Sequence, residues 1–176
     1  MPSRFDRPLR TVPLRFFDLE TTGLRPDRGA RIAEMAVVDE GGVRFDWVSA
    51  HDSPRDEAVA FQLPRLMAHL EDGIAVGHNL SFDFRFVTYE AERLGLGGID
   101  VRFIDTLGMA RAVLDGADSH RLGALLDTVG CTPEEELHTA VGDALATRAL
   151  FWRLVARGAF TTPADVGVKR LRWHGR

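Results

Sequence analysis

The chain has 176 residues, 45% of them hydrophobic, and a formal net charge of −4 at neutral pH. These values predict one folded domain with a substantial core, and they exclude a disordered chain and a broadly basic nucleic-acid coat. The apolar runs are too short to cross a bilayer, and the N-terminal stretch lacks the apolar segment of a secretory signal. We therefore expect a cytoplasmic protein that makes no membrane contact. The single cysteine, Cys131, excludes an internal disulfide.

The predicted elements begin as strands and continue as strands that alternate with helices. Residues 14–20 read as a buried strand, followed by a strand pair at 30–40 and 42–50 with Gly41-Gly42 as its turn. Later strands are expected at 73–79 and 101–105, and helices at 55–72, 81–95, 106–115, 119–129 and 140–157. Pro64 should weaken or kink the first helix. This order predicts one mixed α/β sheet with helices on its faces.

Two carboxylates, Asp18 and Glu20, stand at the end of the first predicted strand, in the stretch "FFDLETTGL". Residues i and i+2 of a strand share a face, so the two side chains project together. Like charges this close are costly unless a cation lies between them, and hard divalent ions prefer oxygen ligands. The pair predicts a metal site; the alternative is a strand end whose carboxylates point to water.

Two further aspartates follow in ordered positions. Asp83 lies in the first turn of the helix after "GHN", where Ser81 is a candidate cap, and a carboxylate there also complements the helix dipole. Asp143 lies in "HTAVGDALA" among small and apolar residues, which is unexpected for an unpaired charge.

His138 precedes Asp143 by five residues. On one continuous helix the two side chains would point about 140° apart, since each residue turns about 100°. If the helix instead begins after Thr139, a good N-cap, His138 falls in the preceding loop and can reach the same site. The alternative is a solvated loop histidine.

Together these motifs resemble the DnaQ-like 3′–5′ exonucleases with the DEDDh pattern, over residues 14–155. The matching residues are Asp18, Glu20, Asp83, His138 and Asp143. Three further stretches agree with the family: "RIAEMAVV" with Glu34, "IDTLGMAR" and "HRLGALLDTVG". The resemblance implies an RNase H-like fold with a mixed five-stranded sheet of order 3-2-1-4-5, in which strand 2 is antiparallel. We expect one exonuclease domain over 1–160 and a short basic C-terminal tail over 161–176. The tail is expected to be frayed and solvated; the alternative is that it guides single-stranded nucleic acid.

The resemblance also implies a chemistry. Two divalent ions, Mg²⁺ or Mn²⁺, would be held by the four carboxylates, and His138 would act as general base. The product would be a nucleoside 5′-monophosphate cut from a 3′ end.

Several residues are implied in holding the terminal nucleotide. They are Thr21, Thr22, Gly23, Leu24, Asn79 and Phe82. A backbone contact is expected at Thr21 and an apolar wedge at Leu24, although Phe82 is equally suited to the core. Glu34 is either a supporting carboxylate or a sheet-surface residue, and Asp105 is expected to cap the helix at Thr106 rather than to bind metal.

The chain departs from the family pattern in two places. The segment 51–73 is shorter than in many relatives, which leaves one wall of the nucleotide pocket open to question. Before His138, "TPEEE" brings three glutamates that either repel a phosphate backbone or favour a short helical turn.

The leading hypothesis is an exonuclease acting on single-stranded DNA 3′ ends, of the proofreading type found in the DNA polymerase III epsilon subunit, with a polymerase subunit as a candidate partner. The first alternative is a 3′–5′ exoribonuclease similar to RNase T or oligoribonuclease. The second is a catalytically silent domain that binds nucleic acid or a partner. The third is an unrelated α/β phosphatase or nuclease.

Overall fold

The apolar stretch at the start of the chain forms β1 (Leu14–Thr21), the central strand of a six-stranded sheet. The computed structural model describes residues 6–50 and 54–175. The strand order is β3-β2-β1-β4-β5-β6. The other strands are β2 (Ile32–Asp39), β3 (Gly42–Val48), β4 (Ile74–Gly77), β5 (Ile99–Asp105) and β6 (Lys169–Trp173).

Strand β2 runs antiparallel to β1, whereas β4 runs parallel to it, as does β5 to β4. The predicted order 3-2-1-4-5 with an antiparallel second strand is therefore confirmed. The predicted count of five strands is wrong, because β6 pairs antiparallel with β5 at the edge of the sheet.

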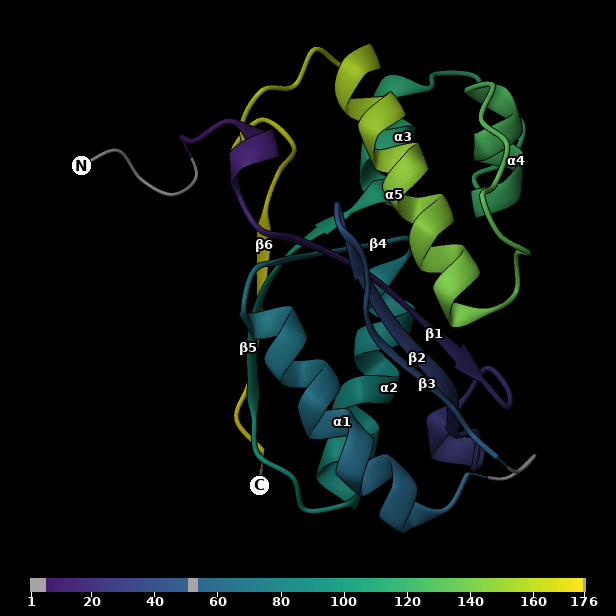
Figure 1. Cartoon of the computed structure of the whole chain (residues 1–176), viewed down its shortest axis with the longest axis vertical. Coiled ribbons are helices and arrows are strands. Elements are labelled where there is room, and N and C mark those ends of the chain that lie inside the picture. The colour runs from purple at the N-terminus through teal and green to yellow at the C-terminus, as the bar shows by residue number, and fades with distance from the viewer. Residues whose placement is uncertain (1–5, 51–53, 176) are drawn as a thin grey trace.

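Helices cover both faces of the sheet (Figure 1). Helices α1 (Asp56–Glu71) and α2 (Leu80–Arg93) pack with one apolar cluster, and α3 (Thr106–Val113), α4 (Leu122–Thr128) and α5 (Ala140–Arg157) pack with the other. Two short 3₁₀ turns, η1 (Leu9–Thr11) and η2 (Pro26–Arg28), precede β1 and β2.

Alternation along β1 decides which side chains reach which face. Phe16 packs in the cluster of α3, α4 and α5, and its neighbour Phe17 packs in the cluster of α1 and α2. Asp18 and Glu20 have the parity of Phe16, so they project toward the face that α5 covers. The sequence periodicity therefore delivers both carboxylates to the same helix.

Some local expectations are wrong in detail. The hairpin pairs Asp39 with Gly42, so its two turn residues are Glu40 and Gly41, and Gly42 (φ 115°) already opens β3. The first helix continues from Asp56 to Glu71 with Pro64 inside it, and the weakening or kink expected at this proline stays a prediction.

Two expected helix signals also fail. Ser81 does not cap α2: the N-cap is Asn79, and the Ser81 hydroxyl donates to the Asn79 side chain at 3.2 Å. The segment "TPEEE" forms no helical turn, and the Glu134 carboxylate instead accepts from Arg148 at 3.2 Å.

The frayed tail expected at the C-terminus is wrong over Lys169–Trp173, which form β6. Arg170 and Arg172 both donate to the Asp100 carboxylate from the neighbouring strand, the latter at 3.2 Å, and Leu171 packs on the α1–α2 cluster. A basic stretch is therefore neutralised in part by an acidic partner that lies 70 residues earlier. The division of the chain after residue 160 stays a prediction.

Within the described ranges, no helix is both long and apolar enough to cross a membrane.

We predict that Leu171→Ala lowers the free energy of unfolding by about 1–2 kcal/mol, because a half-buried side chain leaves the core. The matched control is Val43→Ala on the opposite edge strand, where the side chain is 53% exposed and the loss should stay within about 0.5 kcal/mol. Urea unfolding of both variants measures the difference. Equal losses would mean that β6 contributes no more than an exposed edge residue.

Candidate active site

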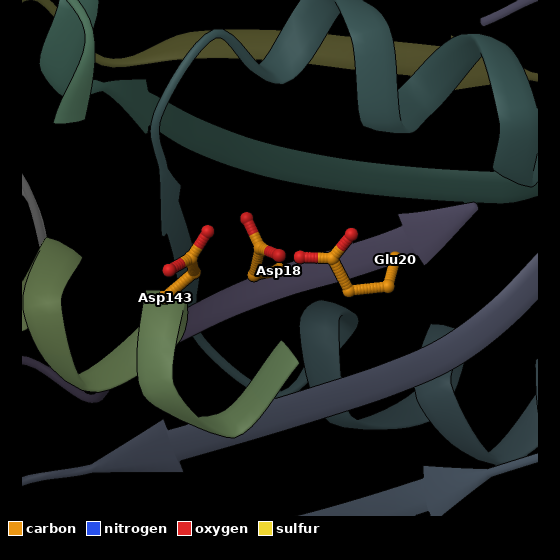
Figure 2. A group of neighbouring side chains, drawn as sticks. All are labelled: Asp18, Glu20 and Asp143. Atoms are coloured by element: carbon orange, nitrogen blue, oxygen red, sulfur yellow. The ribbon is translucent and has the colours of Figure 1, made fainter. Parts of the chain in front are cut away.

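Three carboxylates from β1 and α5 meet at one point of the sheet (Figure 2). One oxygen from each of Asp18, Glu20 and Asp143 lies within 4.8 Å of the others. Asp18 lies between the other two, and all three side chains are partly buried. The helix delivers Asp143 from a position 123 residues away from Glu20 in the chain, so the cluster exists only in the folded protein.

The fourth predicted carboxylate, Asp83, lies beside this cluster but outside it. It is 4% exposed in the first turn of α2, near enough to Asp18 for each charge to oppose the other. Strand β1 pairs in parallel with β4 from Leu14 to Phe16, so the end of β1 runs past β4. There the backbone N–H of Leu19 favours the charged form of Asp83.

Burial and mutual repulsion dominate the electrostatics of the site. Burial, followed by the charges of Asp83 and Asp143, raises the pKa of Asp18 well above its usual range. Burial is also the main cause that raises the pKa of Asp83, to about 8, and the pKa of Glu20. Each shift means that the charged form is disfavoured when no cation is bound.

The donor set fits a hard divalent cation. All the converging atoms are carboxylate oxygens, and neighbouring carboxylates add to the burial that raises the pKa of Asp18 and of Glu20. Ions of the Mg²⁺, Mn²⁺ and Ca²⁺ type prefer such ligands. A divalent cation would remove the repulsion that the pKa shifts report.

The N-terminus of α5 is held by two caps. The Thr139 hydroxyl accepts from the N–H of Gly142 at 3.0 Å, and Glu34 Oε2 from β2 accepts from the N–H of Ala140 at 3.0 Å. Both interactions satisfy helix donors that would otherwise lack partners. Glu34 is therefore a supporting carboxylate, which resolves the alternative that the sequence left open.

His138 lies in the loop before α5, as its position next to Thr139 predicts. It adopts a left-handed backbone conformation (φ 70°), which is uncommon for a residue other than glycine. Its backbone N–H donates to Asp143 Oδ1 at 3.1 Å, and its side chain is exposed. The loop thus places the imidazole beside the carboxylates while the backbone orients one of them.

Gly142 allows this loop to lie against the helix. A Cβ at this position would collide with the carbonyl oxygen of Glu136 and would meet the Thr139 hydroxyl at 2.8 Å. Glycine permits backbones to approach closely because it has no side chain. This requirement is invisible in the sequence, where Gly142 reads as an ordinary weak point in a helix.

The residues predicted to hold a terminal nucleotide continue β1 beyond Glu20. The Thr21 hydroxyl donates to the carbonyl of Gly23 at 2.8 Å, which closes the turn. Thr22, Gly23 and Leu24 line a cavity of about 340 Å³, and the Leu24 side chain is 75% exposed. An exposed leucine at the rim of a cavity is suited to contact an apolar ligand surface.

Asn79 and Phe82 lie in different surroundings. Asn79 lines a cleft of about 630 Å³ together with His138 and Asp143. Phe82 is half-buried and packs on Phe86, with ring centroids 5.0 Å apart. Its position favours the core interpretation that the sequence left open.

Asp105 caps α3, as expected. Its Oδ1 accepts from the N–H groups of Leu107 at 3.0 Å and of Asn79 at 2.9 Å, so one carboxylate links the start of α3 to the turn before α2.

The sequence reasoning missed the other residues that line the large cleft. They include His78, Arg111, His120 and Arg121. The arginines and His120 occur in stretches that resemble the family, "IDTLGMAR" and "HRLGALLDTVG", but their spacing gives no sign that they share a surface with Asp143.

A family model described as exonuclease (RNase_T) matches residues 50–151. The chain belongs to this exonuclease family. Its carboxylate cluster and sheet order agree with the DnaQ-like 3′–5′ exonucleases that the motifs resemble, and the family implies dependence on divalent metal.

Two relatives illustrate the range of the family. A DNA polymerase III subunit epsilon-like protein of Rhodobacter capsulatus is 32% identical over 97% of this chain, and the match covers 28% of that protein. The 3′-5′ exonuclease DinG of Bacillus subtilis is 27% identical over 80% of this chain and 17% of its own length. The chain therefore spans less than a third of either relative.

Among solved structures, exonuclease X in complex with 5′-overhanging duplex DNA has a TM-score of 0.60 and 24% identity. The match covers 87% of this chain and 97% of that chain. This likeness confirms the predicted RNase H-like fold.

We predict that Gly142→Ala lowers exonuclease activity by roughly 10²-fold, because small displacements of catalytic groups are costly. The added methyl group must push the 136–139 backbone away from α5. The matched control is Gly108→Ala in α3, where nothing lies within 4 Å of the added Cβ and a small gain in stability is expected. Activity assays and thermal melts of both variants check this. Unchanged activity in Gly142→Ala would show that the loop position is not critical.

Proposed function

We propose that this exonuclease removes nucleoside 5′-monophosphates from the 3′ ends of single-stranded DNA. The observation that carries the proposal is the convergence of Asp18, Glu20 and Asp143 within 4.8 Å, with His138 adjacent through its hydrogen bond to Asp143. A site of this kind combines charge stabilisation with a titratable group on a loop.

Asp18, Glu20 and Asp143 are proposed as metal ligands, with Asp83 completing the set. When bound, two divalent ions, Mg²⁺ or Mn²⁺, supply Lewis-acid polarisation of the scissile phosphate and neutralise its charge. The protein contributes a preorganised cluster. Glu34 and Thr139 hold the N-terminus of α5, which carries Asp143, and β1 carries the other two ligands.

His138 is proposed as the general base. A ring nitrogen of the exposed imidazole accepts the proton of the attacking water, and His138 lines the same cleft as Asp143. The backbone N–H of His138 holds Asp143. The His138 ring forms no hydrogen bond with another described residue. Proton removal and ligand orientation therefore depend on one loop position.

Residues 21–24 are proposed to receive the terminal nucleotide. The turn exposes Leu24 at the rim of its cavity, where the side chain can wedge against a base, and the Thr21 turn brings backbone close to the ligand. Arg85 donates to the carbonyl of Leu24 at 2.7 Å, so α2 holds this turn in place.

Two statements about the substrate rest on the relatives alone. The name of the Rhodobacter relative supports DNA and a replicative polymerase partner for this chain. The alternative is RNA, since discrimination depends on contacts to the 2′-hydroxyl.

The first test compares matched 5′-labelled DNA and RNA strands with Mg²⁺ and with Mn²⁺. We expect the DNA strand to shorten from its 3′ end in single-nucleotide steps, while a 3′-phosphate and a circular strand resist. The control is Asp143→Asn, which should be inactive and at least as stable as the wild type without metal, because one repelling charge is removed. Cleavage of the circle would contradict the proposal, and faster digestion of RNA would favour the exoribonuclease alternative.

The second test concerns His138. We predict that His138→Ala lowers kcat by roughly 10²–10⁴-fold, the usual scale for losing a general base. The KM and the thermal stabilisation by Mg²⁺ should stay unchanged, since the backbone contact to Asp143 does not need the side chain. Steady-state kinetics and melts with and without metal measure both. A wild-type kcat would show that another group takes the proton.

A further inference from the structure

A large cleft begins at the active site and extends away from it. Its volume is about 630 Å³, within the usual range of ligand pockets of roughly 300–1,000 Å³. His138 and Asp143 line one part, while the rest of its wall comes from α3, the start of α4 and the turn after β4. The proposed chemistry uses only the first part of this surface.

Two arginines line the remote part of the cleft. Arg111 ends the "IDTLGMAR" stretch in the last turn of α3, and Arg121 is the N-cap residue of α4. Both side chains are exposed, and neither guanidinium has an ion pair or hydrogen bond with another of the described residues. This contrasts with Arg15, Arg31, Arg93, Arg148 and Arg170, which all pair with carboxylates. Among the described residues, these two cleft arginines have no carboxylate partner, in a chain of net charge −4.

A hydrogen bond links the segment before Arg121 to the residue that follows β4. The Nε2 of His78, at the end of β4, lies 2.9 Å from the carbonyl oxygen of His120, and a carbonyl can only accept, so Nε2 is the donor. His78 Nδ1 faces the buried Thr106 hydroxyl at 2.9 Å. Burial lowers the pKa of His78. The segment before Arg121 is therefore positioned on a rigid element.

The carboxylates separate the two cavities. Asp143 lines the large cleft, Glu20 leads through β1 to the turn at residues 21–24, and Asp18 lies between them (Figure 2). A strand whose terminal nucleotide occupies the turn and whose scissile phosphate faces the carboxylates can continue past Asp143 into the large cleft. The three glutamates of "TPEEE" do not line it.

We propose that Arg111 and Arg121 bind backbone phosphates on the 5′ side of the scissile bond, so that the enzyme selects strands of several nucleotides over short esters. This inference rests on the proposed function. Guanidinium groups pair well with phosphate oxygens, and contacts of this kind position a strand without reading its sequence. The two arginines supply local positive charge at the cleft of a chain whose net charge is −4.

The experiment compares two substrates. One is a DNA dodecamer; the other is the 4-nitrophenyl ester of thymidine 5′-monophosphate, which has no phosphate beyond the one that is cleaved. Arg111→Ala and Arg121→Ala should each lower kcat/KM on the dodecamer roughly tenfold, mainly through KM, and leave the ester within about twofold. Arg111→Lys and Arg121→Lys should recover most of the loss. The control is Arg153→Ala, an exposed arginine of α5 outside the cleft, which should change neither substrate.

The salt dependence of the reaction and a comparison of DNA with RNA provide a second readout. Each arginine lost should reduce the slope of log(kcat/KM) against log[salt] on the dodecamer by about 0.7, the value for one phosphate contact to a single strand. The same fold-loss is expected on an RNA dodecamer, because phosphate is common to both.

Binding separates this inference from the proposed function. Fluorescence anisotropy of the labelled dodecamer in EDTA needs no cleavage, and each Arg→Ala variant should bind roughly tenfold more weakly than the wild type. Unchanged dodecamer affinity, or equal losses on the dodecamer and the ester, would overturn the phosphate site. A wild-type enzyme that binds the strand through the arginines but cleaves nothing would overturn only the proposed function.

Discussion

The repulsion among buried carboxylates is the constraint on which the rest of the site depends. Asp18, Glu20 and Asp143 converge within 4.8 Å, and burial together with mutual charge raises the pKa of the first two. Such a cluster costs stability unless a cation is present. The fold tolerates it because each carboxylate comes from a regular element whose apolar neighbours are well packed: Phe17 and Leu19 flank Asp18 on β1, and Ala144 follows Asp143 on α5.

The supporting interactions all act on the start of α5. Glu34 accepts a hydrogen bond from the first helical residue, Thr139 caps the helix, and the backbone of His138 holds Asp143. A single helix terminus therefore fixes a proposed ligand and the proposed base at once. This arrangement explains why a glycine is needed at position 142, since a Cβ there would collide with the carbonyl oxygen of Glu136 in the loop.

Charge is distributed so that acidic and basic functions stay apart. Carboxylates cluster at the end of β1. Arg111 and Arg121 line a cleft wall that His78 anchors to the end of β4. Several other arginines pair with carboxylates, as at the buried Glu90, which accepts from Arg31 and Arg93 at 2.6 Å each. Arg111 and Arg121 place positive charge where the proposed path of the strand leaves the carboxylates.

The sequence by itself determined the features that follow from local periodicity. Alternation along β1 placed Asp18 and Glu20 on one face, and the N-cap preference of Thr139 placed His138 in a loop before α5. Motif order pointed to the family, and the family resemblance, rather than local periodicity, implied the central strand order. Only the tertiary structure decided the role of Glu34, the sixth strand at Lys169–Trp173, and the shared cleft of Arg111 and Arg121. Each of these depends on contacts between segments tens of residues apart, and their geometry is set by packing rather than by any local pattern.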